Sequence, residues 1–241
     1  MKKYTLLLIL SLSFMFCKAQ KLKPSSFDIV GGIGQSFRTL KFDDSDTSLV
    51  NVNSSRSREE AIVSYKLGVN SHFNIRPHLY LKLGVLYSTS GSQRKLGELW
   101  SRTDLIELSK LPESAGASFT NASWRFTDYF FDFPINLGYI HRKKRFQPFI
   151  EMGLTLRYYL GTASSFNSDT YNSSEWIQYD FNKTQWAING SAGFLVNLKN
   201  NYAVFAQLNH LRNITSLKTA LILEFPYSTF IEIGFRKQLE K

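Results

Sequence analysis

Three ionisable residues of this sequence have the side-chain types that hydrolytic chemistry uses, namely Asp128, Asp132 and His210. A carboxylate close to an imidazole can activate a water molecule or a serine for attack on an ester or a peptide bond. Asp128 and Asp132 share one face of an expected strand, because strand side chains alternate with a period of two. His210 has the parity of Val204 and Leu208, on the apolar face of another expected strand. We therefore predict no catalytic residue and keep a lipid-modifying or proteolytic enzyme as an alternative.

Metal and phosphate chemistry also has few candidate residues. The acidic run Asp43-Asp44-Ser45-Asp46 offers oxygen ligands, but it lacks the glycine and the terminal glutamate of a calcium loop. The run Gly31-Gly32-Ile33-Gly34 does not lead into a helix, so it does not match a phosphate-binding loop. The other histidines, His72, His78 and His141, are expected at the periplasmic end, as interfacial or turn residues. We therefore predict no metal ligand and no cofactor-binding residue.

The N-terminus has the pattern of an export signal. Two lysines, Lys2 and Lys3, precede an apolar stretch over residues 5–16, and Cys17-Lys18-Ala19 provides a cleavage site. We expect a signal peptide over residues 1–19 and a single domain over residues 20–241. Lipidation of Cys17 is the alternative, although the bulky Phe16 stands where lipoprotein processing requires a small residue.

Cleavage after Ala19 removes the single cysteine of the sequence, so disulfide and thiol chemistry are not expected in the mature chain. It also removes three lysines, which lowers the formal net charge from +10 to +7. Export argues against nucleic acid as the partner of this basic chain. The positive charge is better explained by contact with anionic lipid headgroups or lipopolysaccharide.

Segments of about ten residues alternate apolar and polar side chains, which is typical of strands with two different faces. Tyr65, Leu67 and Val69 fall on one face, whereas Lys66 and Asn70 fall on the other. The expected strands are residues 27–39, 61–74, 79–89, 126–140, 146–161, 185–198, 202–211 and 225–238. A short helix is also expected within residues 99–111, over one mouth of the fold.

The connections between these strands are alternately long and short. Short links are expected at Pro77, at the basic turn 141–145 and at Lys199-Asn200-Asn201. Long polar links are expected at 41–58, 90–125 and 162–182. This pattern predicts an all-β fold, an eight-stranded antiparallel up-and-down transmembrane β-barrel with short periplasmic turns and long outer loops.

The main alternative all-β fold is a secreted, lipocalin-like barrel with an apolar interior. The polar face favours the membrane barrel, because glycine recurs on it and fits a narrow lumen better than a solvated exterior. These glycines are Gly68, Gly84, Gly138, Gly153, Gly193 and Gly234. Aromatic girdles are expected at both rims of the apolar face. The outer rim would hold Tyr65, Tyr87, Tyr129, Tyr158 and Trp186, and the periplasmic rim Phe73, Tyr139, Tyr202 and Phe235.

Parity also directs charged side chains into the lumen. The expected cations are Lys66, Lys82, Arg157 and Arg236, and the expected anions are Asp128, Asp132, Glu151 and Glu232. Charges in a desolvated interior must be paired. We therefore predict a structural network of ion pairs, with an ion path or a catalytic carboxylate pair as alternatives. An open diffusion pore is not expected from a barrel this narrow.

Three short motifs resemble the PorT-like outer-membrane β-barrel family. Asp132-Phe133-Pro134-Ile135 is similar to a family signature that a glycine and a tight turn follow, as Gly138 and residues 141–145 do here. Pro148-Phe149-Ile150-Glu151-Met152-Gly153 resembles the family's next strand, and 231–235 its last strand. The resemblance covers most of residues 27–235. It implies an eight-stranded barrel in the outer membrane of a Gram-negative envelope, and a founding member linked to protein secretion.

One feature departs from that pattern. Outer-membrane barrels commonly end on an aromatic residue that the assembly machinery reads, but here Phe235 is followed by six more residues.

These observations predict an integral protein of the cell outer membrane, non-enzymatic, with a structural or surface-interaction role through its outer loops. The first alternative is an accessory component of an outer-membrane protein secretion system. Expected partners are the lipid bilayer, lipopolysaccharide, the barrel-assembly machinery and an unidentified surface or secretion-system protein, with no nucleic acid.

Overall fold

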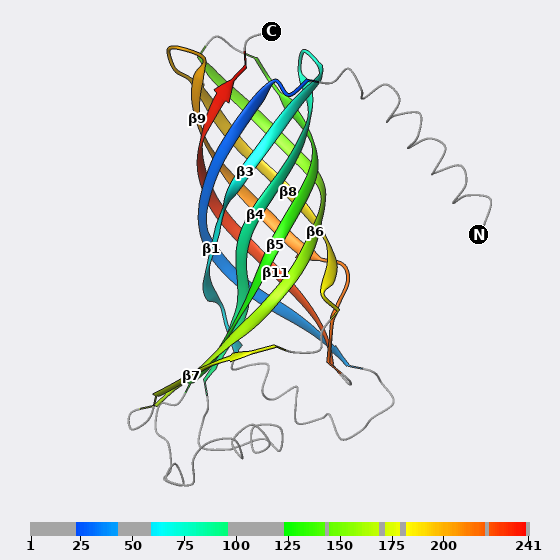
Figure 1. Ribbon diagram of the computed structural model, residues 1–241, viewed down its shortest axis with the longest axis vertical. Coiled ribbons are helices and arrows are strands. Elements are labelled where there is room, and N and C mark those ends of the chain that lie inside the picture. Colours follow the sequence, from blue (N-terminus) through cyan, green and yellow to red (C-terminus); the bar gives the residue numbers. More distant parts are fainter. Residues whose placement is uncertain are drawn as a thin grey trace, which may run out of the picture.

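The computed structural model describes residues 23–42, 59–95, 123–142, 145–168, 172–178, 182–219 and 222–239. These residues form eight long strands that close into a tall barrel (Figure 1). The long strands are β1 (Ser26–Phe42), β3 (Ile62–Arg76), β4 (Leu79–Lys95), β5 (Ser123–Ile140), β6 (Phe146–Asn167), β8 (Thr184–Asn197), β9 (Tyr202–Asn213) and β11 (Ile222–Gln238). Three shorter strands, β2 (Glu59–Glu60), β7 (Asn172–Ile177) and β10 (Leu217–Thr219), pair with β4, β6 and β11.

Each long strand pairs antiparallel with the long strand that follows it in the chain. The last strand, β11, then pairs antiparallel with β1 from Ser26 opposite Gln238 to Phe42 opposite Ile222. Closure leaves neither β1 nor β11 with a free edge, which is the condition for satisfying backbone hydrogen bonds where water is absent. The predicted fold class is confirmed.

The short connections lie together at one end of the barrel, which we call the turn end. Both ends of the described chain lie there too (Figure 1). Pro77 and His78 form the turn between β3 and β4. Asn200 and Asn201, between β8 and β9, have φ angles of 59° and 62°. Asparagine tolerates this left-handed conformation, which a tight two-residue hairpin requires. The opposite end is called the loop end.

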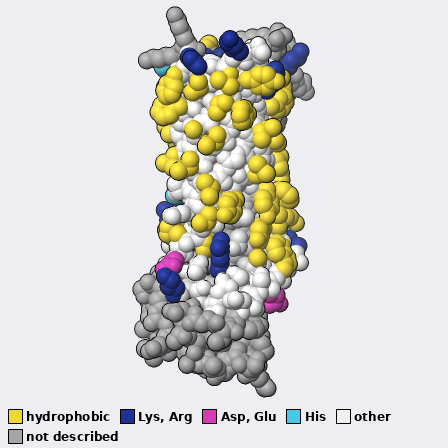
Figure 2. Space-filling view, turned by 90° about the vertical axis from the view of Figure 1, so that its left-hand side faces the viewer, with side chains coloured by type: hydrophobic (Ala, Val, Ile, Leu, Met, Phe, Trp, Pro, Cys, Tyr) yellow, Lys and Arg dark blue, Asp and Glu magenta, His cyan; other side chains and the backbone are white. Residues whose placement is uncertain are grey.

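The two faces of the strands are as the alternation predicts. Large apolar side chains point away from the barrel, among them Leu67, Met152 and Ile231. Figure 2 shows them as a belt along the barrel wall, with Lys and Arg near both ends of the wall. Soluble proteins rarely expose an apolar area of this extent. The lipocalin-like alternative is therefore wrong, because its apolar rows would face inward.

The glycines of the inner face make room for neighbouring side chains. A Cβ atom on Gly138 would lie 2.3 Å from the Tyr80 ring, and one on Gly84 would lie 2.1 Å from Asn70 Oδ1. The expected crowding of the lumen is confirmed.

Several strands extend further toward the loop end than predicted. β4 continues to Lys95, β5 begins at Ser123, and β6 continues to Asn167. The predicted loops 90–125 and 162–182 therefore contain strand ends and β7. In the described part of the chain, no helix is long and apolar enough to span a membrane. The expected signal peptide, the acidic run 43–46 and the helix within 99–111 lie outside the described residues.

Candidate functional site: the lumen and its two mouths

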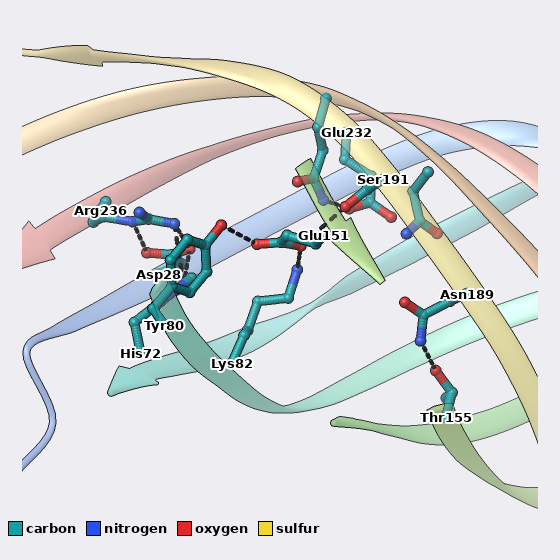
Figure 3. A network of polar contacts seen from close by, with 12 residues as sticks. Asp28, His72, Tyr80, Lys82, Glu151, Thr155, Asn189, Ser191, Glu232 and Arg236 are labelled. Atoms are coloured by element: carbon teal, nitrogen blue, oxygen red, sulfur yellow. Dashed lines mark hydrogen bonds and ion pairs between the residues drawn. The ribbon is translucent and has the colours of Figure 1, made fainter. Parts of the chain in front are cut away.

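The layer of the lumen nearest the turn end is organised around Asp28. Arg236 donates hydrogen bonds to both of its carboxylate oxygens, from Nε at 2.7 Å and from a terminal nitrogen at 2.9 Å. His72 Nε2 lies 2.6 Å from Asp28 Oδ2, and its ring packs 5.2 Å from the ring of Tyr80. Figure 3 shows that these residues converge from four strands, β1, β3, β4 and β11. These contacts therefore link the first and last strands of the barrel with β3 and β4.

A second group forms around Glu151 of β6. Its carboxylate accepts hydrogen bonds from Tyr80 Oη at 2.8 Å and from Ser191 Oγ at 2.9 Å, and it pairs with the Lys82 ammonium (Figure 3). Tyr80 also contacts His72, so the two groups are continuous. All of these side chains are buried, and each charge has an opposite charge beside it.

A third group lies around Glu232 of β11. The Lys66 ammonium is 2.9 Å from Glu232 Oε1, and it donates a second hydrogen bond of 2.9 Å to Asn209 Oδ1. Gln207 donates to the other oxygen of Glu232. The ammonium also lies 4.3 Å from the centre of the Phe230 ring, a favourable cation–π contact.

The fourth group, nearest the loop end, is built on Arg157 of β6. Its guanidinium donates to Asp132 Oδ1 at 2.9 Å, to Asn213 Oδ1 at 2.9 Å and to Ser88 Oγ at 3.2 Å. It also lies over the ring of Phe130 at 3.9 Å from the ring centre. Arg157 is 1% exposed, so its donors are satisfied by protein groups.

These four groups correct the predicted pairing in one respect. Three of the four expected cations pair with expected anions, but Arg236 pairs with Asp28, which the sequence reasoning did not include. Asp128 instead accepts a hydrogen bond from Thr162 Oγ1. Asp28 has the parity of Val30 and points inward, so the alternation of β1 was the signal that could have found it.

His72 is a second correction. It lies near the turn end of β3, as expected, but it is not an interfacial or turn residue, because it is 2% exposed and lies inside the lumen. Its parity with Lys66 and Asn70 explains this position, because all three side chains leave the same face of β3. His78 and His141 lie at the turn end as expected, with ring centres 6.4 Å apart.

The three residues considered for hydrolysis are not brought together. Asp132 pairs with Arg157 inside the lumen, and Asp128 bonds to Thr162. His210 is exposed on the outside of β9, with Nδ1 2.9 Å from Thr229 Oγ1. Within the described ranges, no three His, Cys, Asp or Glu side chains gather as they would around a metal ion.

Sequence reasoning also missed an apolar cluster inside the lumen, which lies among the charged groups. Its members are Val30, Tyr80, Leu86, Ile140, Phe149, Leu195, Ala203 and Phe205. Together with the ion pairs it fills the barrel. The cavity beside Lys66, Lys82 and Asp132 has a volume of about 20 Å³, enough for about one water molecule. The lumen at this level is a packed core and not an open channel.

A much larger cavity, of about 870 Å³, opens at the turn end, and we call it the turn-end cavity. Its floor includes His72, Tyr80 and Arg236, and its rim includes Lys23 and Arg142. Strand ends from β1, β3, β4, β5, β6, β8 and β11 enclose it.

At the loop end, part of the sheet continues past the barrel wall (Figure 1). β8 pairs with β6 only as far as Tyr158, whereas residues 162–167 of β6 pair with β7 on one side and with residues 123–128 of β5 on the other. We call these three segments the surface extension. Within it, the Trp124 ring lies 5.7 Å from the Phe166 ring, and the Trp176 ring lies 5.1 Å from that of Tyr129, the next residue of β5.

Comparison with protein-family models matches residues 18–218 to the outer membrane protein beta-barrel domain. The chain belongs to this outer-membrane β-barrel family. Membership agrees with the closed barrel and its apolar belt, and it places the protein in the outer membrane. Short turns of such barrels face the periplasm and longer loops face outward. The turn end of this outer-membrane barrel is therefore periplasmic, and the surface extension lies on the outer side.

Solved outer-membrane barrels are similar to this one. Neisserial surface protein A has a TM-score of 0.44 and 11% identity, over 89% of this chain and 97% of its own. OprG from Pseudomonas aeruginosa has a TM-score of 0.44 and 12% identity, over 91% and 99%. Ail, the attachment invasion locus protein of Yersinia pestis, has a TM-score of 0.32 and 12% identity, over 89% and 99%. No curated protein sequence matches the chain.

Proposed function

We propose that this outer-membrane barrel is a non-enzymatic surface protein that binds a partner through its surface extension. The observation that carries the proposal is the contrast between its two parts. The lumen is filled by paired charges and packed rings, which leaves it unsuited to passage of solutes. The surface extension continues beyond the barrel wall and presents aromatic side chains.

Trp176 of β7 is the most informative side chain of the surface extension. It is 56% exposed, although it packs over Gly161 and beside Tyr129. Partly exposed tryptophan held on a rigid sheet is a frequent anchor in protein interfaces. Binding residues also concentrate on segments that a rigid scaffold positions, as the barrel does here.

Site-specific crosslinking in intact cells tests this proposal. A photoreactive phenylalanine replaces Trp176 in one strain, and replaces Trp186 of the barrel wall in a control strain. We expect a covalent adduct to an extracellular or surface component at position 176 and none at 186, and we expect Trp176→Ala to weaken capture at neighbouring positions. Equal adducts at both positions, or none at 176, would contradict a binding role for the surface extension.

A second candidate function is an accessory role in protein secretion. The support is the resemblance to the PorT-like family in the 132–135 and 148–153 motifs, together with a large cavity that faces the periplasm. A deletion strain would then export its secreted proteins poorly, measured by proteomics of the culture medium. Normal export in that strain would remove this candidate.

Lipopolysaccharide is the lipid partner that we propose for the outer leaflet. Arg212 of β9 is exposed on the outside near the loop end, where it is placed to meet lipid phosphate groups.

A further inference from the structure

The turn-end cavity has the size of a ligand site and lies apart from the surface extension. Its volume of about 870 Å³ is within the range of protein pockets that bind small molecules and short peptides. The cavity is enclosed by strand ends, so it lies inside the ring of strands and not against the lipid. Lys23, Asn74, Ile140, Arg142, Leu195 and Arg236 are among the residues that line it.

The side chains of this lining that carry a permanent charge are all cations. Lys23, Arg142 and Arg236 are basic, and no Asp or Glu is among the described residues that line the cavity. Asp28 lies just beneath the floor and neutralises Arg236. Lys23 and Arg142 are exposed at the rim, where no carboxylate of the described chain pairs with them. Their charge is available to a ligand, and it makes the mouth attractive to anions.

The described acidic side chains on the surface lie at the opposite end of the barrel. Glu59, Glu60 and Glu175 belong to β2 and β7, at the loop end. Exposed cations at the turn end, including Arg76 and Lys199, surround the mouth of the cavity instead. Figure 2 shows Asp and Glu only toward the loop end of this face, whereas Lys and Arg are present at both ends. An anion in the periplasm is therefore drawn toward the turn end.

The lining also has groups that suit a peptide. Asn74 and Gln238 carry amide side chains that each have a second polar group besides the one bonded to Arg142 or to Asn197, and the buried side chains of Ile140 and Leu195 form part of an apolar wall. His72 Nδ1 is buried and has no hydrogen-bond partner within the described chain, although His72 lines the cavity. A buried polar atom without a partner is unusual, and a bound polar group would satisfy it.

We propose that the turn-end cavity binds a carboxylate-bearing peptide segment of a periplasmic protein. Lys23 and Arg142 hold the carboxylates, and the amide and apolar walls hold the peptide chain. Lipid headgroups fit less well, because they surround the barrel from outside while the cavity lies within it. Inorganic phosphate shares the charge but leaves the apolar walls without contacts.

A binding titration with the folded, full-length mature protein in detergent tests this inference. The probe is a fluorescein-labelled peptide of alternating leucine and glutamate, followed by fluorescence anisotropy. We expect saturable binding, and a Kd at least about tenfold higher for the double variant Lys23→Gln/Arg142→Gln, since charge-assisted hydrogen bonds are lost. Arg76→Gln/Lys199→Gln removes two cations from the same end outside the cavity lining, and we expect less than about a twofold change.

Further measurements distinguish binding in the cavity from nonspecific electrostatic attraction. A peptide with glutamine in place of glutamate should bind at least about tenfold more weakly, and inorganic phosphate should not displace the acidic peptide. Equal losses in the two double variants, or full displacement by phosphate or by vesicles of anionic phospholipid, would overturn the proposal. Electrophoresis with and without boiling shows that each variant is a folded barrel. These results are independent of crosslinking at Trp176, because the two sites lie at opposite ends.

Discussion

Arg157 and Asp132 show what a single residue contributes to the inside of the barrel. Both side chains are 1% exposed, and the Arg157 guanidinium also bonds to Asn213 and Ser88. Removing one partner of a buried pair leaves the other charge without compensation, at a cost of about 3–5 kcal/mol. We expect Arg157→Met to lower the free energy of unfolding by about this amount, measured by urea unfolding in phospholipid vesicles.

The double variant Arg157→Met/Asp132→Asn should recover much of that loss, because no unpaired charge is left. Lys95→Met serves as the control, since the Lys95–Glu60 pair is exposed and contributes at most about 1 kcal/mol. Equal effects of Arg157→Met and Lys95→Met would show that the lumen is wet.

Glycine at position 153 is required by close packing and not by backbone conformation. A Cβ atom there would lie 2.1 Å from the carbonyl oxygen of Ile135 and 2.5 Å from Asn136 Oδ1. We expect Gly153→Ala to cost about 1–3 kcal/mol of unfolding free energy, as overpacking does. At Gly190 the nearest atom would be 3.9 Å away, so Gly190→Ala should be neutral within about 0.5 kcal/mol. The same urea titration compares the two variants.

The side chains that the sequence placed correctly are those for which parity alone was used. Lys66, Lys82 and Arg157 point inward as predicted, because the pleat fixes the alternation. His72 was not expected in the lumen because its position near the end of the strand was given more weight than the face from which its side chain leaves. Which charged residues pair with each other could not be predicted in the same way. Asp28 and Arg236, for example, meet only because β1 pairs with β11 when the barrel closes.

At the scale of elements, the strands were predictable within the apolar belt and less so beyond it. Outside the lipid both faces of a strand can be polar, so alternation disappears while backbone pairing continues. Ser90 and Ser92 of β4 illustrate this, because both lie in the strand with no apolar neighbour to mark it. The surface extension was missed for the same reason.

The hairpin between β8 and β9 gives a test at this scale. Asn200 and Asn201 both have left-handed φ angles, which cost a β-branched residue about 1–2 kcal/mol. We expect Asn201→Val to lower the free energy of unfolding by about that amount and Asn201→Gly to preserve it. Lys199→Val, at a described position without positive φ, should be nearly neutral. Equal losses at 199 and 201 would indicate that the turn conformation is not the cause.

For the whole molecule, the apolar belt requires lipid around the barrel. Ile231 is 62% exposed near the middle of β11, where it pairs with Ile33 of β1. We expect Ile231→Arg to cost about 2–4 kcal/mol in phospholipid vesicles, because a charge then faces hydrocarbon. Ile75→Arg, at the turn end of β3, should cost about 0–1 kcal/mol. A neutral result at position 231 would mean that water wets the belt.

The contact between Asp28 and Arg236 has a consequence for biogenesis. The two residues face each other across the seam of the cylinder, although 208 positions of sequence separate them. A nascent or truncated polypeptide therefore carries Asp28 without its counter-ion until the final strand docks against the first. The ion pair can form only when the final strand is present. An unfinished polypeptide therefore lacks this stabilising contact and is less stable in the envelope than the complete chain.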